Sequence, residues 1–163
     1  MSIGLMVAAP ILKTQIQREK EEELIFRGNQ YVEAVRLYQA KNPGKHPASL
    51  EDLFDPEERF IRKLYKDPIS KDGEWKVVLL PDISATTKPG QSASSSASKV
   101  MVAPQQALSQ IRSPKIVGVV SSSSEASIRI YLGQETYDSW LFYLGLDADN
   151  FPEIVEYGET EKK

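Results

Sequence analysis

Residues 13–41 carry a helical pattern that constrains every fold open to this chain. Apolar side chains and one glycine recur there at spacings of three and four, at Leu24, Gly28, Tyr31, Val32, Val35 and Tyr38. Residues at such spacings share one face of an α-helix. The helix should end near Asn42, because Pro43 disfavours a helical residue before it. The sequence therefore predicts one long helix whose apolar face packs on a core.

A short apolar run, Ile3 to Leu12, precedes this helix and leads into a solvated, mixed-charge stretch, Arg18 to Glu23. The run is about half as long as the roughly 20 apolar residues that a membrane-spanning helix requires. Two interpretations are open. The run is either an N-terminal turn packed on the body of the protein or the second half of a transmembrane helix whose first half precedes Met1.

Short elements are expected after the helix. Ser49 and Asp52 have the spacing of a capping box, and Asp55-Pro56 repeats the start signal, so two short helices are expected between residues 49 and 64. Trp75 to Leu80 is a strand-like run that Pro81 ends. Three more strands are expected, at 115–121, 127–132 and 139–144.

The expected fold is α+β, with the long N-terminal helix packed on a small antiparallel sheet of three to four strands. Residues 1–42 form the helix, residues 43–146 a globular head with a flexible Ser-rich insertion at 82–113, and residues 147–163 an acidic mobile tail. Within the insertion, a weak helical turn is expected around Gln105–Ile111. The interface between helix and sheet should bury these side chains: Leu24, Tyr31, Val35, Tyr38, Trp75, Val77, Ile128, Ile130 and Trp140.

Composition excludes several functional classes. The 163 residues suit one domain, and a net charge of −3 argues against nucleic acid as a partner, since phosphate binding needs a basic surface. There is no cysteine, which excludes disulfides, thiol nucleophiles and Cys-ligated zinc.

No catalytic constellation is evident, and we expect no enzymatic activity. His46 is the only histidine and lies between Lys45 and Pro47 in a connecting segment. A catalytic histidine needs a nucleophile and an orienting partner. The serines at 121–124 lack the G-x-S-x-G context of a nucleophile elbow, and a hairpin turn explains them better. No phosphate-binding glycine loop is present either.

The acidic residues near the C-terminus are weak calcium candidates. Asp147, Asp149 and Glu153 lie close in sequence and supply the hard oxygen ligands that calcium prefers. Their spacing does not match an EF-hand loop, so a solvated acidic tail is the alternative. No other cofactor is indicated.

Taken in order, these segments resemble a known family. The segments are AAP, QREKEEELIFRGNQYVEAVRLY, NPGKHPASLEDL, YKDPISKDGEW, VGVVSSSSEASIRIYLG and YDSWLF. In this order they resemble the type IV pilin-like proteins, and most of all the pseudopilins of type II secretion systems. The resemblance runs from about Val7 to Phe142 and is interrupted by the Ser-rich insertion. Pro10 matches the helix-breaking proline that the family often has in its anchor.

The resemblance implies a structural subunit of a type II secretion pseudopilus or type IV pilus-like filament. Such a protein is anchored by a single pass in the bacterial inner membrane, with its head in the periplasm or at the cell surface. Its partners would be other pilin or pseudopilin subunits, an inner-membrane assembly platform and a prepilin peptidase, whose processing is accompanied by methylation. The family's leader and the Glu near the start of its anchor are missing, so Met1 would fall inside the anchor. Trimming, a misassigned start or a member that has lost processing would account for this, and the first two are favoured. The alternative is a soluble adaptor that docks through its amphipathic helix.

Overall fold

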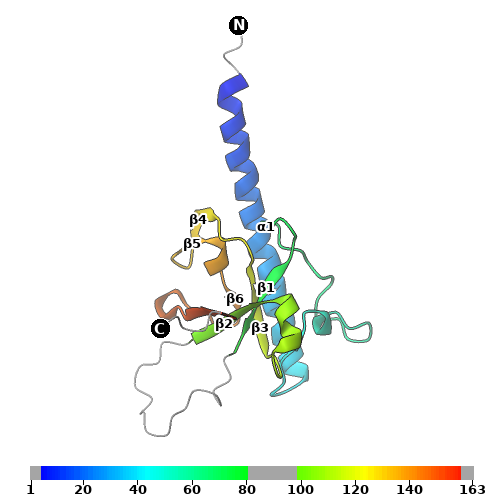
Figure 1. The fold of residues 1–163 in the computed structure, drawn as a ribbon. Coiled ribbons are helices and arrows are strands. Elements are labelled where there is room, and N and C mark those ends of the chain that lie inside the picture. Colours follow the sequence, from blue (N-terminus) through cyan, green and yellow to red (C-terminus); the bar gives the residue numbers. More distant parts are fainter. Residues whose placement is uncertain (1–4, 81–98, 159–163) are drawn as a thin grey trace, which may run out of the picture.

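One long helix dominates the computed structural model, which describes residues 5–80 and 99–158. Helix α1 runs from Leu5 to Lys41, and its 37 residues correspond to a length of about 55 Å. Figure 1 shows its C-terminal half lying against the rest of the protein, while the N-terminal part stands clear of it. The sequence prediction of where this helix ends is confirmed.

The predicted apolar stripe is the face that α1 buries. Leu24, Tyr31 and Val35 are at most 2% exposed, and Tyr38 is partly buried against the same core. Gly28 lies on the same face of the helix, where the helix backbone closely approaches an aromatic ring. A Cβ atom at Gly28 would come within 2.4 Å of the ring of Phe142. The glycine thus permits a close approach of helix and sheet.

A five-stranded sheet with the order β6-β3-β1-β2-β7 packs on this stripe. Its strands are β1 (Trp75–Leu79), β2 (Lys99–Pro104), β3 (Ile116–Ser121), β6 (Phe142–Tyr143) and β7 (Glu153–Glu156). Three pairings are antiparallel and one, β2 with β7, is parallel. The α+β class and the helix-on-sheet packing are therefore confirmed. The sheet is mixed and larger than the antiparallel sheet of three to four strands that was expected.

The expectation of a flexible insertion at 82–113 is wrong for residues 99–113. They form β2 and the 3₁₀ helix η3 (Gln105–Gln110), and η3 confirms the helical turn expected around Gln105–Ile111. Val100 and Val102 are buried on one side of β2 and Ala103 on the other, so this segment has enough apolar bulk to pair with β1. Residues 82–98 of the expected insertion lie outside the described part of the chain.

The expectation of a mobile tail from residue 147 is wrong for residues 147–158. These residues form the 3₁₀ helix η5 (Ala148–Asn150) and strand β7. Phe151 and Ile154 pack on a second apolar cluster, which contains Val78, Val100 and Val102. This segment is ordered because apolar side chains interrupt its acidic ones; residues 159–163 lie outside the described part.

A two-stranded sheet is separate from the main one and consists of β4 (Ala126–Tyr131) and β5 (Gln134–Thr136). The prediction that Ile128 and Ile130 are buried against α1 is wrong, since they are 41% and 63% exposed. They alternate with Arg129 and Tyr131, whose side chains contact α1 and the core instead. The expected strand at 139–144 shortens to β6, preceded by the 3₁₀ helix η4 (Tyr137–Ser139) and by buried Trp140.

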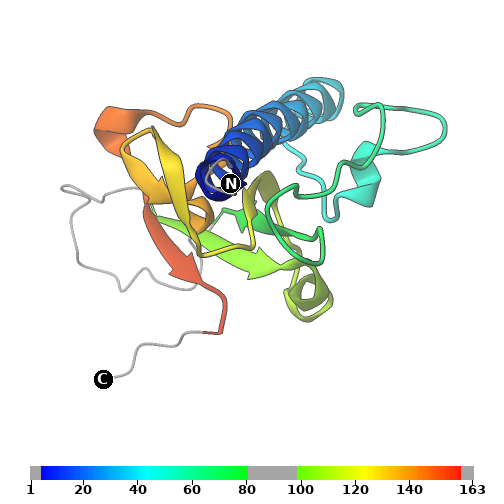
Figure 2. The same cartoon turned by 90° about the horizontal axis from the view of Figure 1, so that it is seen from above.

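The connector between α1 and β1 contains one of the two short helices expected. Asp52 accepts from the amide of Ser49 (3.1 Å) and the Ser49 hydroxyl accepts from the amide of Asp52 (3.3 Å). This confirms the capping box at the start of the 3₁₀ helix η1 (Glu51–Leu53). The second helix does not form, because the amides of Phe60 and Ile61 donate back to Leu53. Figure 2 shows the connector on one side of α1 and the β4–β5 hairpin on the other.

Candidate functional site

The N-terminal part of α1 is the most unusual surface of the protein. Ile11, Leu12 and Ile16 are 66%, 60% and 51% exposed, within two turns of one helix. Single exposed apolar residues are ordinary, but several in one short segment mark a contact surface. The N-terminal part of α1 stands clear of the head in Figure 1, and Ile16 lies where the helix meets the head, at the edge of a cleft with Ile69 and Tyr137.

Within residues 5–80 and 99–158, no helix is both long enough and apolar enough to cross a bilayer.

A buried carboxylate marks the point where α1 meets the head. Glu21 is 1% exposed, and it accepts hydrogen bonds from the Tyr137 hydroxyl (2.8 Å) and the amides of Ile128 (2.6 Å) and Arg129 (3.2 Å). Three donors compensate for the burial of the charge, which would otherwise be costly. Glu21 thereby binds the β4–β5 hairpin and η4 to the helix.

Tyr137 completes this junction. Its hydroxyl also accepts from the side-chain amide of Gln17, at 2.8 Å. Burial of the phenol raises the pKa of Tyr137 to about 12, Gln17 opposes this rise, and the hydrogen bond to Glu21 adds to it. The phenol therefore stays neutral over the physiological range and can donate to Glu21.

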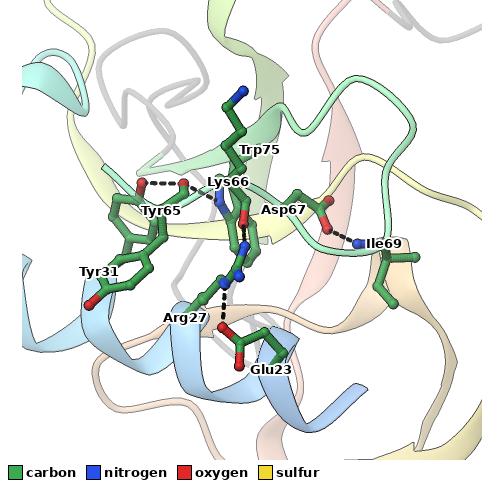
Figure 3. A network of polar contacts seen from close by, with 8 residues as sticks. All are labelled: Glu23, Arg27, Tyr31, Tyr65, Lys66, Asp67, Ile69 and Trp75. Atoms are coloured by element: carbon green, nitrogen blue, oxygen red, sulfur yellow. Dashed lines mark hydrogen bonds and ion pairs between the residues drawn. The ribbon is translucent and has the colours of Figure 1, made fainter. Parts of the chain in front are cut away.

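A second network fixes the connector to α1 (Figure 3). Arg27 bridges the carboxylate of Glu23 (2.6 Å) and the carbonyl oxygen of Lys66 (2.8 Å). One turn further along, Tyr31 donates to the carbonyl oxygen of Tyr65 at 2.8 Å, and the indole of Trp75 donates to the same oxygen at 3.0 Å. Helix, connector and first strand therefore meet at the Tyr65 carbonyl.

Asp67 extends the network to the end of β3. Only 3% exposed, it accepts from the Ser121 hydroxyl (2.6 Å) and from the amides of Ile69 (2.8 Å), Ser70 (3.3 Å) and Ser122 (3.2 Å). The Ser121 side chain is thus buried, and its hydroxyl donates to a carboxylate. This contact stabilises the fold and does not expose the hydroxyl as a nucleophile. The head and α1 are joined by a buried carboxylate at Glu21 and by polar contacts at Arg27 and Tyr31.

His46 follows α1 in the connector and is partly buried. Burial, together with nearby Lys115, lowers its pKa. Among the described hydrogen bonds none joins His46 to a hydroxyl or a carboxylate, so the structure supplies it with neither a nucleophile nor an orienting partner.

The structure does not bring the calcium candidates together. Asp147 accepts from the amide of Asp149 (3.2 Å) and so starts η5, while Glu153 pairs with Lys99 on β2 (3.1 Å). Residues 5–80 and 99–158 contain no group of three or more His, Cys, Asp or Glu side chains placed to hold a metal ion.

Sequence reasoning missed Glu21 and Asp67. Glu21 was grouped with the solvated charge run, although it lies three residues before Leu24, on the same face as the apolar stripe. That spacing was the available signal. Asp67 precedes Pro68, as turn residues often do, and nothing local in the sequence indicates that the Ser121 hydroxyl donates to its carboxylate.

No protein-family model, curated protein or solved structure gives a significant match to this chain.

Proposed function

We propose that this protein is a structural subunit of a filament of the type II secretion pseudopilus or type IV pilus kind. The observation that carries the proposal is the division of α1. Its C-terminal half lies against the head, and its N-terminal part projects from it (Figure 1). Ile11 and Leu12 are 66% and 60% exposed, and Ile16, at the edge of a cleft beside Ile69 and Tyr137, is 51% exposed. Exposed apolar side chains on a projecting helix are stabilised when another surface covers them. Identical copies of the same helix can provide that surface.

Physical reasoning supports a bundle of such helices. Side-by-side packing of the N-terminal halves removes the exposed apolar side chains from water, at about 25 cal/mol per Å² of apolar surface. The heads remain outside the bundle, because each is fixed to its own helix at Glu21 and Arg27. The result is a filament with a helical centre and a shell of heads.

The order of segments supports the same proposal. The charged helix, the connector with its capping box and the strand pair after residue 115 all carry the resemblance to pilin-like proteins, and each has a defined place in the fold. In this proposal the natural gene product is held in the inner membrane with its head on the periplasmic side. A prepilin peptidase and an assembly platform would serve it there.

Cross-linking in cells tests the proposal. The natural gene product, expressed from its own reading frame and treated with formaldehyde, should give a ladder of multimers in the membrane fraction. Leu12→Glu should weaken the ladder strongly, because it places a charge in the proposed bundle. Leu64→Glu is the matched control, since Leu64 is 39% exposed on the connector and lies away from the bare helix end.

Two results would contradict the proposal: a monomeric product with no self-cross-links, or a ladder that Leu12→Glu and Leu64→Glu reduce equally. Folding of both variants is checked by thermal unfolding, which should change little because both leucines are exposed.

The alternative is an adaptor whose exposed helix end docks in a groove of another protein. Ile11, Leu12 and Ile16 also suit such a helix-in-groove mode. Cross-links to one different protein, without self-cross-links, would favour the adaptor.

A further inference from the structure

Asp72 and Gly73 form a chemically reactive pair in the loop that precedes β1. They are the only Asp-Gly dipeptide in the sequence, and no Asn-Gly is present. The backbone nitrogen of the residue after an aspartate can attack the side-chain carboxyl group and close a five-membered succinimide ring. Glycine hinders this attack least, because it has no side chain. The sequence therefore places its most reactive bond of this kind at Asp72-Gly73.

The fold requires glycine at position 73. Its φ is +75°, a conformation that residues with a side chain rarely adopt. A Cβ atom there would also lie 3.2 Å from the Lys66 side chain. The Gly73 carbonyl oxygen accepts from the amide of Asp67 at 2.9 Å, which joins the two ends of the loop. Any other residue at this position would strain the loop, so the reactive pair is tied to the fold.

The Asp72 carboxylate is held by two donors within the same loop. Its Oδ1 atom accepts from the amide of Glu74 at 3.0 Å and from the Ser70 hydroxyl at 2.8 Å. The hydrogen bond from the Glu74 amide, and after it the one from Ser70, hold the pKa of Asp72 below its usual value. The side chain is exposed to solvent, and these two contacts favour its ionised form.

Ionisation matters because the succinimide ring closes from the neutral acid. A bond forms between Cγ of Asp72 and the backbone nitrogen of Gly73. The hydroxyl of the carboxyl group and the proton of the amide nitrogen leave together as water. A carboxylate lacks the proton that this oxygen needs to leave, and its negative charge resists the attack. Hydrolysis of the ring then takes up one water and opens either carbonyl, which gives aspartate or isoaspartate.

We propose that Asp72 is the site of isoaspartate formation in this protein, and that the Ser70 hydroxyl and the Glu74 amide slow the reaction in the folded state. Both donors bind the oxygen Oδ1, so they stabilise the carboxylate and restrict rotation of the side chain. The inference does not depend on the proposed filament.

Isoaspartate would disturb the loop that joins the connector to β1. Its main chain runs through the side-chain carbon, so the backbone gains one methylene group and displaces the Gly73 carbonyl from the Asp67 amide. The carboxylate of Asp67 also holds the Ser121 hydroxyl and the Ser122 amide at the end of β3. We therefore expect the isomerised protein, once separated by ion-exchange chromatography, to unfold at a lower temperature than the unchanged protein.

Timed incubation of the purified protein at neutral pH tests the proposal. Peptide mapping with electron-transfer fragmentation distinguishes isoaspartate from aspartate in the peptide that contains Asp72. Ser70→Ala should raise the rate of isoaspartate formation there several-fold. Ser70→Thr keeps the hydroxyl and should stay close to the rate of the unchanged protein. Ser109→Ala, at an exposed serine on η3, is the matched control and should have no effect.

Incubation in urea separates the role of the fold from that of the sequence. Both hydrogen bonds are lost there, so the unchanged chain and Ser70→Ala should isomerise at one common rate, faster than the folded unchanged protein. Asp72→Glu should give no isomerised product in this peptide, because its side chain would have to close a six-membered ring, which forms far more slowly.

Three results would overturn the proposal. Equal rates for folded Ser70→Ala and the folded unchanged protein would show that the hydroxyl does not protect Asp72. Equal acceleration in Ser70→Ala and Ser70→Thr would show that loosening of the loop, and not loss of the hydroxyl, controls the reaction. Isoaspartate that forms first at another aspartate of the unfolded chain would show that the site is assigned wrongly.

Discussion

At the scale of single residues, Gly28 makes the clearest prediction. Replacing a helical glycine with alanine usually stabilises a helix by about 1 kcal/mol. Here the new Cβ would lie within 2.4–2.6 Å of three ring atoms of Phe142. That ring is buried and packs edge-on against Trp75, so it has little room to move. We expect Gly28→Ala to destabilise the protein by about 1–3 kcal/mol, as overpacking does.

Chemical denaturation measures this change, and a double mutant checks its cause. Phe142→Leu removes part of the ring, so Gly28→Ala should cost less in that background than alone. If the two effects are simply additive, the clash with Phe142 is not the reason for the glycine.

The second prediction at this scale concerns alkaline pH. The pKa of Tyr137 is raised to about 12 in the folded protein, above the ordinary value of 10.0. A raised pKa favours the protonated form in the folded state. The stability that this phenol contributes is therefore complete below about pH 10 and is lost as the pH rises toward 12. Tyr137→Phe should flatten this decline, in addition to weakening the contact with Glu21.

Urea denaturation between pH 8 and 11.5 tests the Tyr137 prediction. Tyr157→Phe, at an exposed tyrosine, is the control and should leave the slope unchanged. An unchanged slope in Tyr137→Phe would show that other groups govern alkaline stability. Tyr31 contributes in the same direction, because burial also raises its pKa.

At the scale of elements, strand β7 contributes to the apolar cluster on the face of the sheet that points away from α1. Ile154 packs on the cluster around Val100 and Val102, while its neighbour Val155 is 37% exposed on the same strand. We expect Ile154→Ala to cost on the order of 1–3 kcal/mol. Val155→Ala, the matched control, should cost clearly less. Equal effects would mean that β7 does not cover this cluster. Thermal unfolding of the two variants gives the comparison.

Elements with strong periodicity were predictable from the sequence, and those defined by distant partners were not. The helix to Lys41 and the strands after Trp75 and Lys115 follow from local patterns. Strand β7 is four residues long and acidic at both ends, and its pairing with β2 depends on chain far away in the sequence. The exposure of Ile128 and Ile130 was not predicted. An alternating pattern assigns residues to the two faces of a strand, but it does not say which face is buried.

The candidate site also has one part that is visible in the sequence and one part that depends on residues far away in the chain. The apolar run and the charged segment after it are visible in the sequence, but the sequence left open whether the run packs on the body of the protein or belongs to a transmembrane helix. The junction at Glu21 could not be anticipated, because its donors lie more than 100 residues further along the chain.

At the scale of the whole molecule, the structure is a head fixed rigidly to one half of a helix whose other half has no described partner (Figure 1). Rigid attachment matters for the proposed function. Copies that pack through their helices can form a regular filament only if every head keeps the same orientation on its helix. Glu21, Arg27 and Tyr31 hold that orientation through separate contacts between α1 and the head.

Cryo-electron microscopy of filaments sheared from cells that express the natural gene product tests the central claim most directly. The account predicts a helical reconstruction with the N-terminal halves of α1 bundled at the axis and the heads outside. A filament with the heads at its centre and the N-terminal part of α1 facing solvent would contradict the account.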